Sequence, residues 1–198
     1  MSARTIRLLL VLAGFLAGLG TLFGILLLVV RPETAAMAPS AAAIGGPFRL
    51  IDQDGRAVSE RDFAGEPYLV FFGFTHCPDV CPTTLMELSD VLDKLGGDAR
   101  IGALFITVDP ERDTPAELKE YLSSFNPRFK GLTGDPAAIA QVAKSYRVYL
   151  KKVPLDNGDY TMDHTALVYL MDKNGKFVAP FNLKRRPEDA AADLRRYL

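Results

Sequence analysis

The chain holds two cysteines, and both lie in the segment Phe-Thr-His-Cys-Pro-Asp-Val-Cys-Pro, which spans residues 74–82. Cys77 and Cys81 are four residues apart, between an apolar run that favours a strand and a periodic segment that favours a helix. Side chains at this spacing lie one turn apart on the same face of a helix. A helix N-terminus would also stabilise their thiolate forms, which bind metals and attack disulfides. The pair therefore predicts one site of soft-metal or thiol redox chemistry.

Two thiolates favour Cu(I), zinc or an iron–sulfur cluster over calcium or magnesium. Two cysteines from one chain are too few to hold an iron–sulfur cluster, and a further ligand must come from elsewhere. Of the two histidines, His76 adjoins Cys77, and we expect it to pack or to form hydrogen bonds instead of binding a metal. His164 precedes a buried strand whose start would face the dithiol in a thioredoxin-like sheet. A lone histidine is more often structural, but Cys77, Cys81 and His164 would give a three-coordinate site that suits Cu(I), whereas structural zinc needs a fourth ligand.

An apolar segment near the N-terminus, residues 8–30, contains no charged residue, and Thr21 is its one polar residue. A helix needs about 20 residues to cross a bilayer, and this segment is longer than that. Arg4 and Arg7 precede it, so the positive-inside rule places residues 1–7 in the cytoplasm and everything after the segment outside it. We therefore predict a transmembrane anchor at residues 8–30.

A cleaved signal peptide is the alternative interpretation, because Ala36, Met37 and Ala38 resemble a small-residue cleavage site. The apolar core of a signal peptide usually spans only about 7–15 residues, which favours the uncleaved anchor. Residues 31–43 are rich in alanine, proline and serine, and they predict a linker. Residues 44–198 are then predicted to form one exported domain.

The exported part alternates strand and helix patterns, which is typical of an α/β sheet. The dithiol follows a buried strand, and open α/β sheets place their sites at the carboxyl ends of such strands. We expect strands at residues 48–51, 56–58, 68–73, 101–108, 165–171 and 176–179, and helices at residues 82–95, 114–125, 135–146 and 187–198.

Three segments together resemble the signature of the Sco (SenC) copper proteins. They are Phe-Gly-Phe-Thr-His-Cys-Pro-Asp-Val-Cys-Pro-Thr at 72–83, Val-Asp-Pro-Glu-Arg-Asp-Thr-Pro at 108–115 and Asp-His-Thr at 163–165. The resemblance implies an α/β fold with a thioredoxin-like central sheet flanked by helices, preceded by an N-terminal transmembrane helix. It also implies copper binding by Cys77, Cys81 and His164, as Cu(I) alone or as both Cu(I) and Cu(II).

The resemblance further implies a membrane-anchored copper metallochaperone that supports assembly of the binuclear copper site of cytochrome c oxidase subunit II. Subunit II, an upstream copper donor and a thiol reductant would be its partners, and its soluble domain would face the periplasm or the mitochondrial intermembrane space. With 23 Lys and Arg against 24 Asp and Glu and no basic stripe, a nucleic-acid partner is not expected. Such a protein is a metal-binding assembly factor more than an enzyme.

Two acidic residues near the dithiol have alternative roles. Asp109 could tune the site or contact a partner, or it could simply be a turn residue before Pro110. Asp79 could be a neighbour of the metal, but a helix-capping role is favoured. We expect Met86 to pack against the domain and Met162 to lie in a loop.

A thiol–disulfide oxidoreductase that keeps target cysteines reduced for metallation is the main alternative function. Against a general oxidoreductase, the spacing is CxxxC instead of CxxC, and residues 163–165 occupy the region where thioredoxins place a cis-proline. A peroxidase is disfavoured because Pro78 or Phe74 stands where its threonine is expected. A purely structural disulfide would leave His164 unexplained, and so short a loop would stabilise the fold little.

Overall fold

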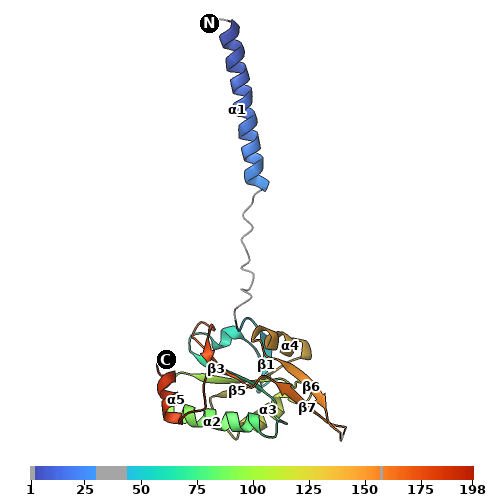
Figure 1. Cartoon of the computed structure of the whole chain (residues 1–198), viewed down its shortest axis with the longest axis vertical. Coiled ribbons are helices and arrows are strands. Elements are labelled where there is room, and N and C mark those ends of the chain that lie inside the picture. Colours follow the sequence, from blue (N-terminus) through green and yellow to red (C-terminus); the bar gives the residue numbers. More distant parts are fainter. Residues whose placement is uncertain (1–2, 30–43, 157) are drawn as a thin grey trace. The chain divides into compact units, whose positions relative to one another are not determined.

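The computed structural model describes residues 3–29, 44–156 and 158–198. The chain divides into two compact units, Met1–Ala41 and Ala42–Leu198. In the first unit, helix α1 runs over Ala3–Val29 (Figure 1). Within the described residues, no helix combines the length and the apolar character needed to cross a membrane, and the span at residues 8–30 stays a prediction. The expected linker at residues 31–43, with the alternative cleavage site inside it, lies outside the described residues.

The second unit is built on a seven-stranded sheet with the order β2-β1-β5-β4-β3-β8-β9. Its centre is parallel, since β4 pairs in parallel with both β3 and β5. β1 and β8 pair antiparallel with this centre, and β2 and β9 pair antiparallel with β1 and β8. The strands are β1 (Arg49–Asp52), β2 (Ala57–Ser59), β3 (Tyr68–Gly73), β4 (Gly102–Thr107), β5 (Phe129–Thr133), β8 (Val168–Met171) and β9 (Phe177–Pro180).

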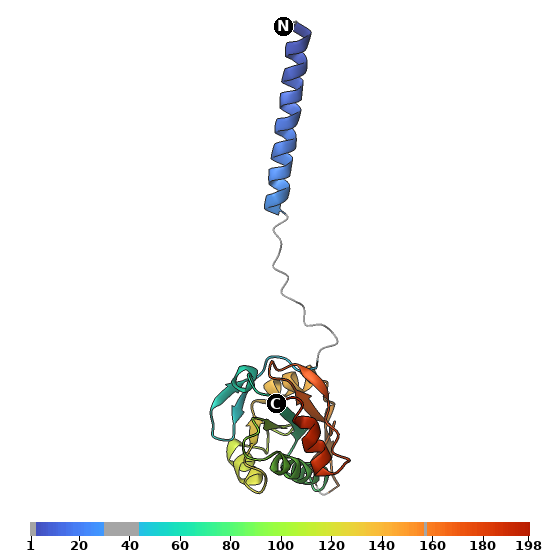
Figure 2. The ribbon, with the colours of Figure 1, turned by 90° about the vertical axis from the view of Figure 1, so that its left-hand side faces the viewer.

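Helices cover both faces of this sheet, because parallel strands need crossover connections. Figures 1 and 2 show α2, α3 and α5 on one side of the strands and α4 on the other. Side chains cap the N-termini of α3 and α4. Thr114 accepts a hydrogen bond from the Glu117 amide, and Asp135 accepts one from the Ala138 amide. The helices are α2 (Val80–Leu95), α3 (Pro115–Leu122), α4 (Pro136–Ser145) and α5 (Pro187–Leu194), with a short 3-10 helix at Glu60–Phe63.

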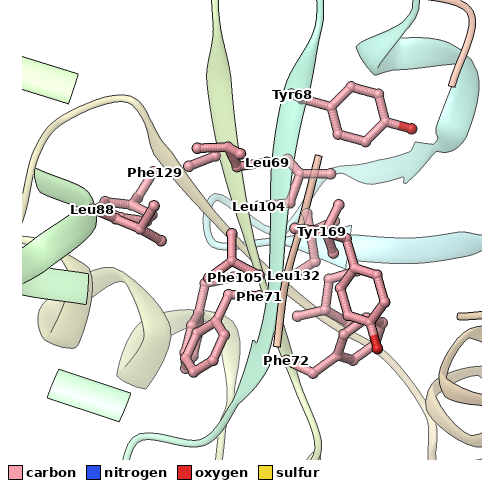
Figure 3. Close-up of a cluster of buried hydrophobic side chains, with 14 of the residues drawn as sticks. Tyr68, Leu69, Phe71, Phe72, Leu88, Leu104, Phe105, Phe129, Leu132 and Tyr169 are labelled. Atoms are coloured by element: carbon pink, nitrogen blue, oxygen red, sulfur yellow. The ribbon is translucent and has the colours of Figure 1, made fainter. Parts of the chain in front are cut away.

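Strand β3 is buried along its whole length, as its unbroken apolar sequence predicts for a strand covered on both faces. Phe71 and Phe105 lie on one face with Leu88 of α2, and Phe72 and Tyr169 lie on the other (Figure 3). The ring of Phe72 also packs 5.3 Å from that of Tyr146. This packing gives β3 a rigid frame, and the cysteine segment begins at its carboxyl end.

The α/β architecture with a central sheet flanked by helices is confirmed, and its parallel β–α–β unit beside an antiparallel hairpin is thioredoxin-like. Three strands were not predicted. β5 was missed because a lysine and a glycine interrupt its short apolar run, Phe129–Thr133. β6 (Leu150–Pro154) and β7 (Tyr160–His164) form a separate two-stranded sheet whose side chains are mostly exposed or half-buried. The expected strand at residues 165–171 is therefore shorter, and only Val168–Met171 belongs to β8.

Candidate metal centre

The two thiols lie where the turn after β3 leads into α2, with Cys77 in the turn and Cys81 in the helix. The Cys77 amide donates to the Phe74 carbonyl at 3.2 Å, which closes the turn. Cys81 is the second residue of α2 and is fully buried, whereas Cys77 is half-buried. The Cys81 amide donates to Cys77 Sγ at 3.4 Å, and neither thiol forms a disulfide. The expected convergence of the two cysteines at the start of a helix is thus observed.

Gly73 makes the space for the buried thiol. A Cβ at this position would lie 2.9 Å from Cys81 Sγ and 2.7 Å from the Phe105 ring. Real Cβ atoms almost never come so close to other heavy atoms. The sequence signal was a glycine at the end of an apolar run, but its purpose is visible only in the packed structure.

Burial raises the pKa of the Cys81 thiol, and the neighbouring Cys77 raises it further. The expectation that the helix N-terminus would hold this residue as a thiolate is therefore wrong for Cys81. The helix dipole is worth only about 0.3–1 kcal/mol near a surface, and the cost of removing a thiolate from water exceeds it. Cys81 is consequently a neutral thiol that must lose its proton when it binds a metal.

His164 comes to the same place from the other side. Its Nε2 lies 3.8 Å from Cys81 Sγ. It is the last residue of β7, so it reaches the thiol from the end of the hairpin and not, as expected, from the start of the following strand. Its ring makes edge contacts with Phe74 and Phe71, with centroids 5.9 and 6.4 Å away.

The hydrogen bonding of His164 assigns its tautomer. Nδ1 lies 3.2 Å from the Thr165 carbonyl oxygen. A carbonyl can only accept, so Nδ1 carries the proton and Nε2 keeps its lone pair directed at Cys81. Burial lowers the pKa of His164, which keeps the imidazole neutral. A neutral imidazole held by a carbonyl on its far nitrogen is the usual form of a metal-binding histidine.

The spacing of these two atoms suits a shared ion. For a zinc-like ion with bonds of about 2.3 Å to sulfur and 2.0 Å to nitrogen at an angle near 120°, the two ligand atoms are roughly 3.7 Å apart. The distance between Cys81 Sγ and His164 Nε2 is 3.8 Å. Across the described residues, however, no group of three or more His, Cys, Asp or Glu side chains is assembled to hold a metal ion. Two of the three expected ligands, Cys81 and His164, therefore lie as far apart as two ligands of one ion, but the three expected ligands do not form a complete group.

The remaining candidates lie around this pair. His76 has a half-exposed side chain, and its Nδ1 lies 3.0 Å from the Thr75 hydroxyl, in keeping with a hydrogen-bonding role. Asp79 is exposed and occupies the N-cap position of α2, but its side chain accepts no capping hydrogen bond. Met86 is 62% exposed and does not pack as expected, while Met162 lies in β7 and packs partly against the core.

Asp109 is buried, with 2% of its surface exposed. Its side chain accepts hydrogen bonds from residues other than the cysteines. Arg112 donates to it through Nε at 2.5 Å, and the Tyr160 hydroxyl donates to it at 3.0 Å. Asp113, also fully buried, accepts hydrogen bonds from Thr75. The importance of Arg112, Asp113, Tyr160 and Thr75 was missed, although two of them lie in the segment at 108–115.

Comparison with known proteins points to one family. The sequence model of the SCO1/SenC family matches residues 36–198. The mitochondrial protein SCO1 homolog 1 of Arabidopsis thaliana is 45% identical over 159 residues, which cover 78% of this chain and 47% of that protein. The chain therefore spans about half the length of this relative. The SCO2-like protein of Rickettsia felis is 38% identical over 198 residues, which cover 96% of this chain and 95% of that protein.

Solved structures agree with this result. The structure of Bradyrhizobium japonicum ScoI with copper bound is 67% identical and superposes with a TM-score of 0.77, covering 79% of this chain and 100% of that one. The structure of BsSco is 28% identical with a TM-score of 0.62, covering 78% of this chain and 93% of that one. BsSco is described as a member of the Sco family of cytochrome c oxidase assembly proteins, and a disulfide switch was identified in it.

Proposed function

This chain belongs to the SCO1/SenC family, and we propose that it binds copper through Cys77, Cys81 and His164 and supports the assembly of cytochrome c oxidase. The observation that carries the proposal is the 3.8 Å separation of Cys81 Sγ from a neutral His164 whose Nε2 lone pair is directed at it. The relative from Bradyrhizobium japonicum was solved with copper bound. The ion is cargo here, taken up from a donor and passed to the binuclear copper site of subunit II.

The protein's own groups suggest how copper would be taken up. Cys81 is a neutral thiol, and Cu(I) binding would displace the thiol protons of both cysteines. Two thiolates and one Cu(I) leave the site with a net charge of −1, and the neutral imidazole adds none. Cys77, Cys81 and His164 do not form a complete three-ligand group in the structure. We therefore infer that the half-buried Cys77 side chain turns toward Cys81 and His164 when the ion binds. The same movement in reverse would let an incoming thiolate replace it during transfer.

A second function, thiol reduction, is favoured by the unequal exposure of the two cysteines. Cys77 is half-buried and Cys81 is buried, so Cys77 is the thiol that a target disulfide can reach. Its thiolate would attack the target, and Cys81 would resolve the mixed disulfide. The pair would lose two electrons and two protons to the target, which gains two thiols, and a Cys77–Cys81 disulfide would remain. An external thiol reductant would then regenerate the pair.

The placement of the protein in the cell is part of the proposal. Residues 1–7 would remain in the cytoplasm, residues 8–30 would anchor the chain, residues 31–43 would form the linker, and residues 44–198 would carry the site. The uncharged apolar run and the preceding Arg4 and Arg7 support this layout. Mitochondrial relatives such as the Arabidopsis protein support a domain facing the intermembrane space or, in bacteria, the periplasm.

An anaerobic Cu(I) titration of the reduced full-length chain in detergent tests the ligand set. A chromophoric Cu(I) chelator serves as competitor, and wild type is compared with His164→Ala. His76→Ala is the matched control, because this histidine lies next to Cys77 but belongs to no expected ligand set. We expect one tight equivalent in wild type and in His76→Ala and a clear loss of affinity in His164→Ala. Equal affinities in all three proteins would contradict the proposal and favour thiol reduction.

A further inference from the structure

One loop contacts both segments that carry the expected ligands. It comprises residues 108–114, between β4 and α3, and is called the 108–114 loop below. Asp113 in this loop is fully buried, and its carboxylate accepts hydrogen bonds from the Thr75 amide at 3.1 Å and the Thr75 hydroxyl at 2.6 Å. The Thr107 hydroxyl donates to the same carboxylate at 2.6 Å. Because Thr75 lies two residues before Cys77, the loop holds the turn that carries the thiols.

The same loop holds the hairpin of β6 and β7 through a second set of contacts. Arg112 donates through Nε to Asp109 at 2.5 Å and through Nη1 to the Tyr160 carbonyl oxygen at 3.2 Å. Its guanidinium carbon lies 3.8 Å from the centroid of the Tyr160 ring. The Tyr160 hydroxyl in turn donates to Asp109 at 3.0 Å. Asp109, Arg112 and Tyr160 thus form a closed cycle of contacts, which we name the clasp.

The clasp is connected to His164 in two ways. Tyr160 and His164 are the first and last residues of β7, and residues four apart in a strand lie on the same face. Arg112 also lies 6.0 Å from the centroid of the Phe74 ring, which makes the edge contact with His164. Arg112 Nη2 is buried and has no hydrogen-bond partner among the described residues, so the aromatic rings provide part of the environment of this charge.

The hairpin needs such support. β6 and β7 pair with each other and form a sheet separate from the seven-stranded one, and an isolated two-stranded sheet is at best marginally stable. Hydrogen bonds between Tyr149 and Thr165 tie its base, with the Thr165 amide donating to the Tyr149 carbonyl at 3.0 Å. The clasp ties the opposite end of β7. Charge-assisted hydrogen bonds of this kind are about twice as strong as neutral ones.

We propose that Arg112 and Tyr160 are positioning residues for the metal site. Through the clasp they fix the β6–β7 hairpin so that His164 stays at ligand distance from Cys81, while Asp113 of the same loop holds the cysteine turn. One loop therefore sets the distance between the thiol half and the imidazole half of the site. The inference rests on the proposed function, since it takes His164 as a ligand, and it goes beyond it by naming residues outside the expected ligand set.

The test uses the full-length chain in detergent with the variants Arg112→Gln, Arg112→Lys and Tyr160→Phe. Lysine keeps the charge of Arg112 but loses its planar set of donors, and phenylalanine keeps the ring of Tyr160 but loses its bond to Asp109. His164→Ala is the reference for a lost ligand. Arg100→Gln is the matched control, because Arg100 is 84% exposed and pairs with Glu66 away from the clasp.

Three readouts separate positioning from simple stability. They are Cu(II) affinity, the thiolate-to-Cu(II) absorption and electron paramagnetic resonance spectra, and amide exchange of β6 and β7 in the copper-free protein. We expect Arg112→Gln to bind Cu(II) about 10–100-fold more weakly, as loss of a supporting contact usually does, with spectra shifted toward those of His164→Ala. Exchange in β7 should be about tenfold faster or more. Arg112→Lys and Tyr160→Phe should show smaller shifts in the same direction, and Arg100→Gln none.

Two results would overturn the inference. If the clasp variants keep wild-type spectra and affinity while His164→Ala changes both, the clasp does not position His164, and the ligand set stands. If His164→Ala itself leaves the spectra and affinity unchanged, the ligand set fails, and the inference fails with it. Tyr160→Phe keeps the test decisive should Arg112→Gln fail to fold, since it removes a single hydrogen bond.

Discussion

The two halves of the proposed metal site are built in opposite ways. The thiol half lies between the fully buried strand β3 and helix α2, within nine consecutive residues at 74–82. The imidazole half lies at the end of a mostly exposed two-stranded sheet. Buried elements therefore frame the thiol half, apart from the half-buried Cys77 side chain, whereas the position of the imidazole half depends on the clasp. We therefore expect variants at the thiol half to weaken the proposed copper binding more than variants at the hairpin.

The largest effect is expected at the thiol half. Cys77→Ser replaces a soft ligand with a hard one at a half-buried position. Cu(I) affinity should fall by more than the roughly 10–100-fold that loss of a supporting contact costs, while thermal unfolding stays close to wild type. Competition with a Cu(I) chelator measures the first and circular dichroism the second. A serine variant that keeps wild-type Cu(I) affinity would show that the thiol half does not provide most of the copper affinity.

The next effect concerns the space reserved for the buried thiol. Gly73→Ala would place a Cβ against Cys81 Sγ and the Phe105 ring. Overpacking of this kind usually costs about 1–3 kcal/mol of unfolding free energy. Gly97→Ala is the control, because a Cβ there meets no atom within 4 Å. Urea unfolding of both variants measures the difference, and equal midpoints would mean that the core around Cys81 yields more easily than this packing indicates.

The burial of side chains around β3 also predicts that the stability of the fold depends on pH. Tyr146 packs on Phe72 of β3, and burial raises its pKa. The unfolded chain ionises this tyrosine near pH 10, whereas the folded chain keeps it neutral, so above about pH 10 the unfolded state binds fewer protons. The free energy of unfolding should therefore fall as pH rises, by at most about 1.4 kcal/mol per pH unit for this residue. Urea unfolding between pH 9 and 11 should give a smaller slope for Tyr146→Phe, and an unchanged slope would argue against its burial.

The smallest effect is expected at the surface of the hairpin. Lys152 Nζ lies 2.6 Å from Glu111 and 3.8 Å from the centroid of the Tyr160 ring, and its side chain is 45% exposed. Exposed ion pairs contribute little, so Lys152→Gln should speed amide exchange in β6 and β7 by no more than about fivefold. A change as large as that of Arg112→Gln would show that the exposed pair, and not the partly buried clasp, holds the hairpin.

Much of the fold was readable from the sequence. The run at 68–73 is β3 residue for residue, and the helix expected at 82–95 is α2 with its start two residues earlier. These elements have strong, uninterrupted patterns because both faces of β3 and one face of α2 are buried. β6 could not be found in this way, since Leu-Lys-Lys-Val-Pro combines exposed charges with a proline and has no continuous apolar face.

The sequence by itself determined the proximity of the two cysteines, predicted soft-metal chemistry there and carried the resemblance to the Sco family. The match to the family model confirms the family. These are local features, since the two cysteines are neighbours on one turn of chain. The tertiary structure alone decided the neutral state of Cys81, the space left by Gly73 and the approach of His164 from a hairpin. The physical reason is that burial and contacts between distant segments set these properties, and neither burial nor such contacts can be read from the order of residues along the chain.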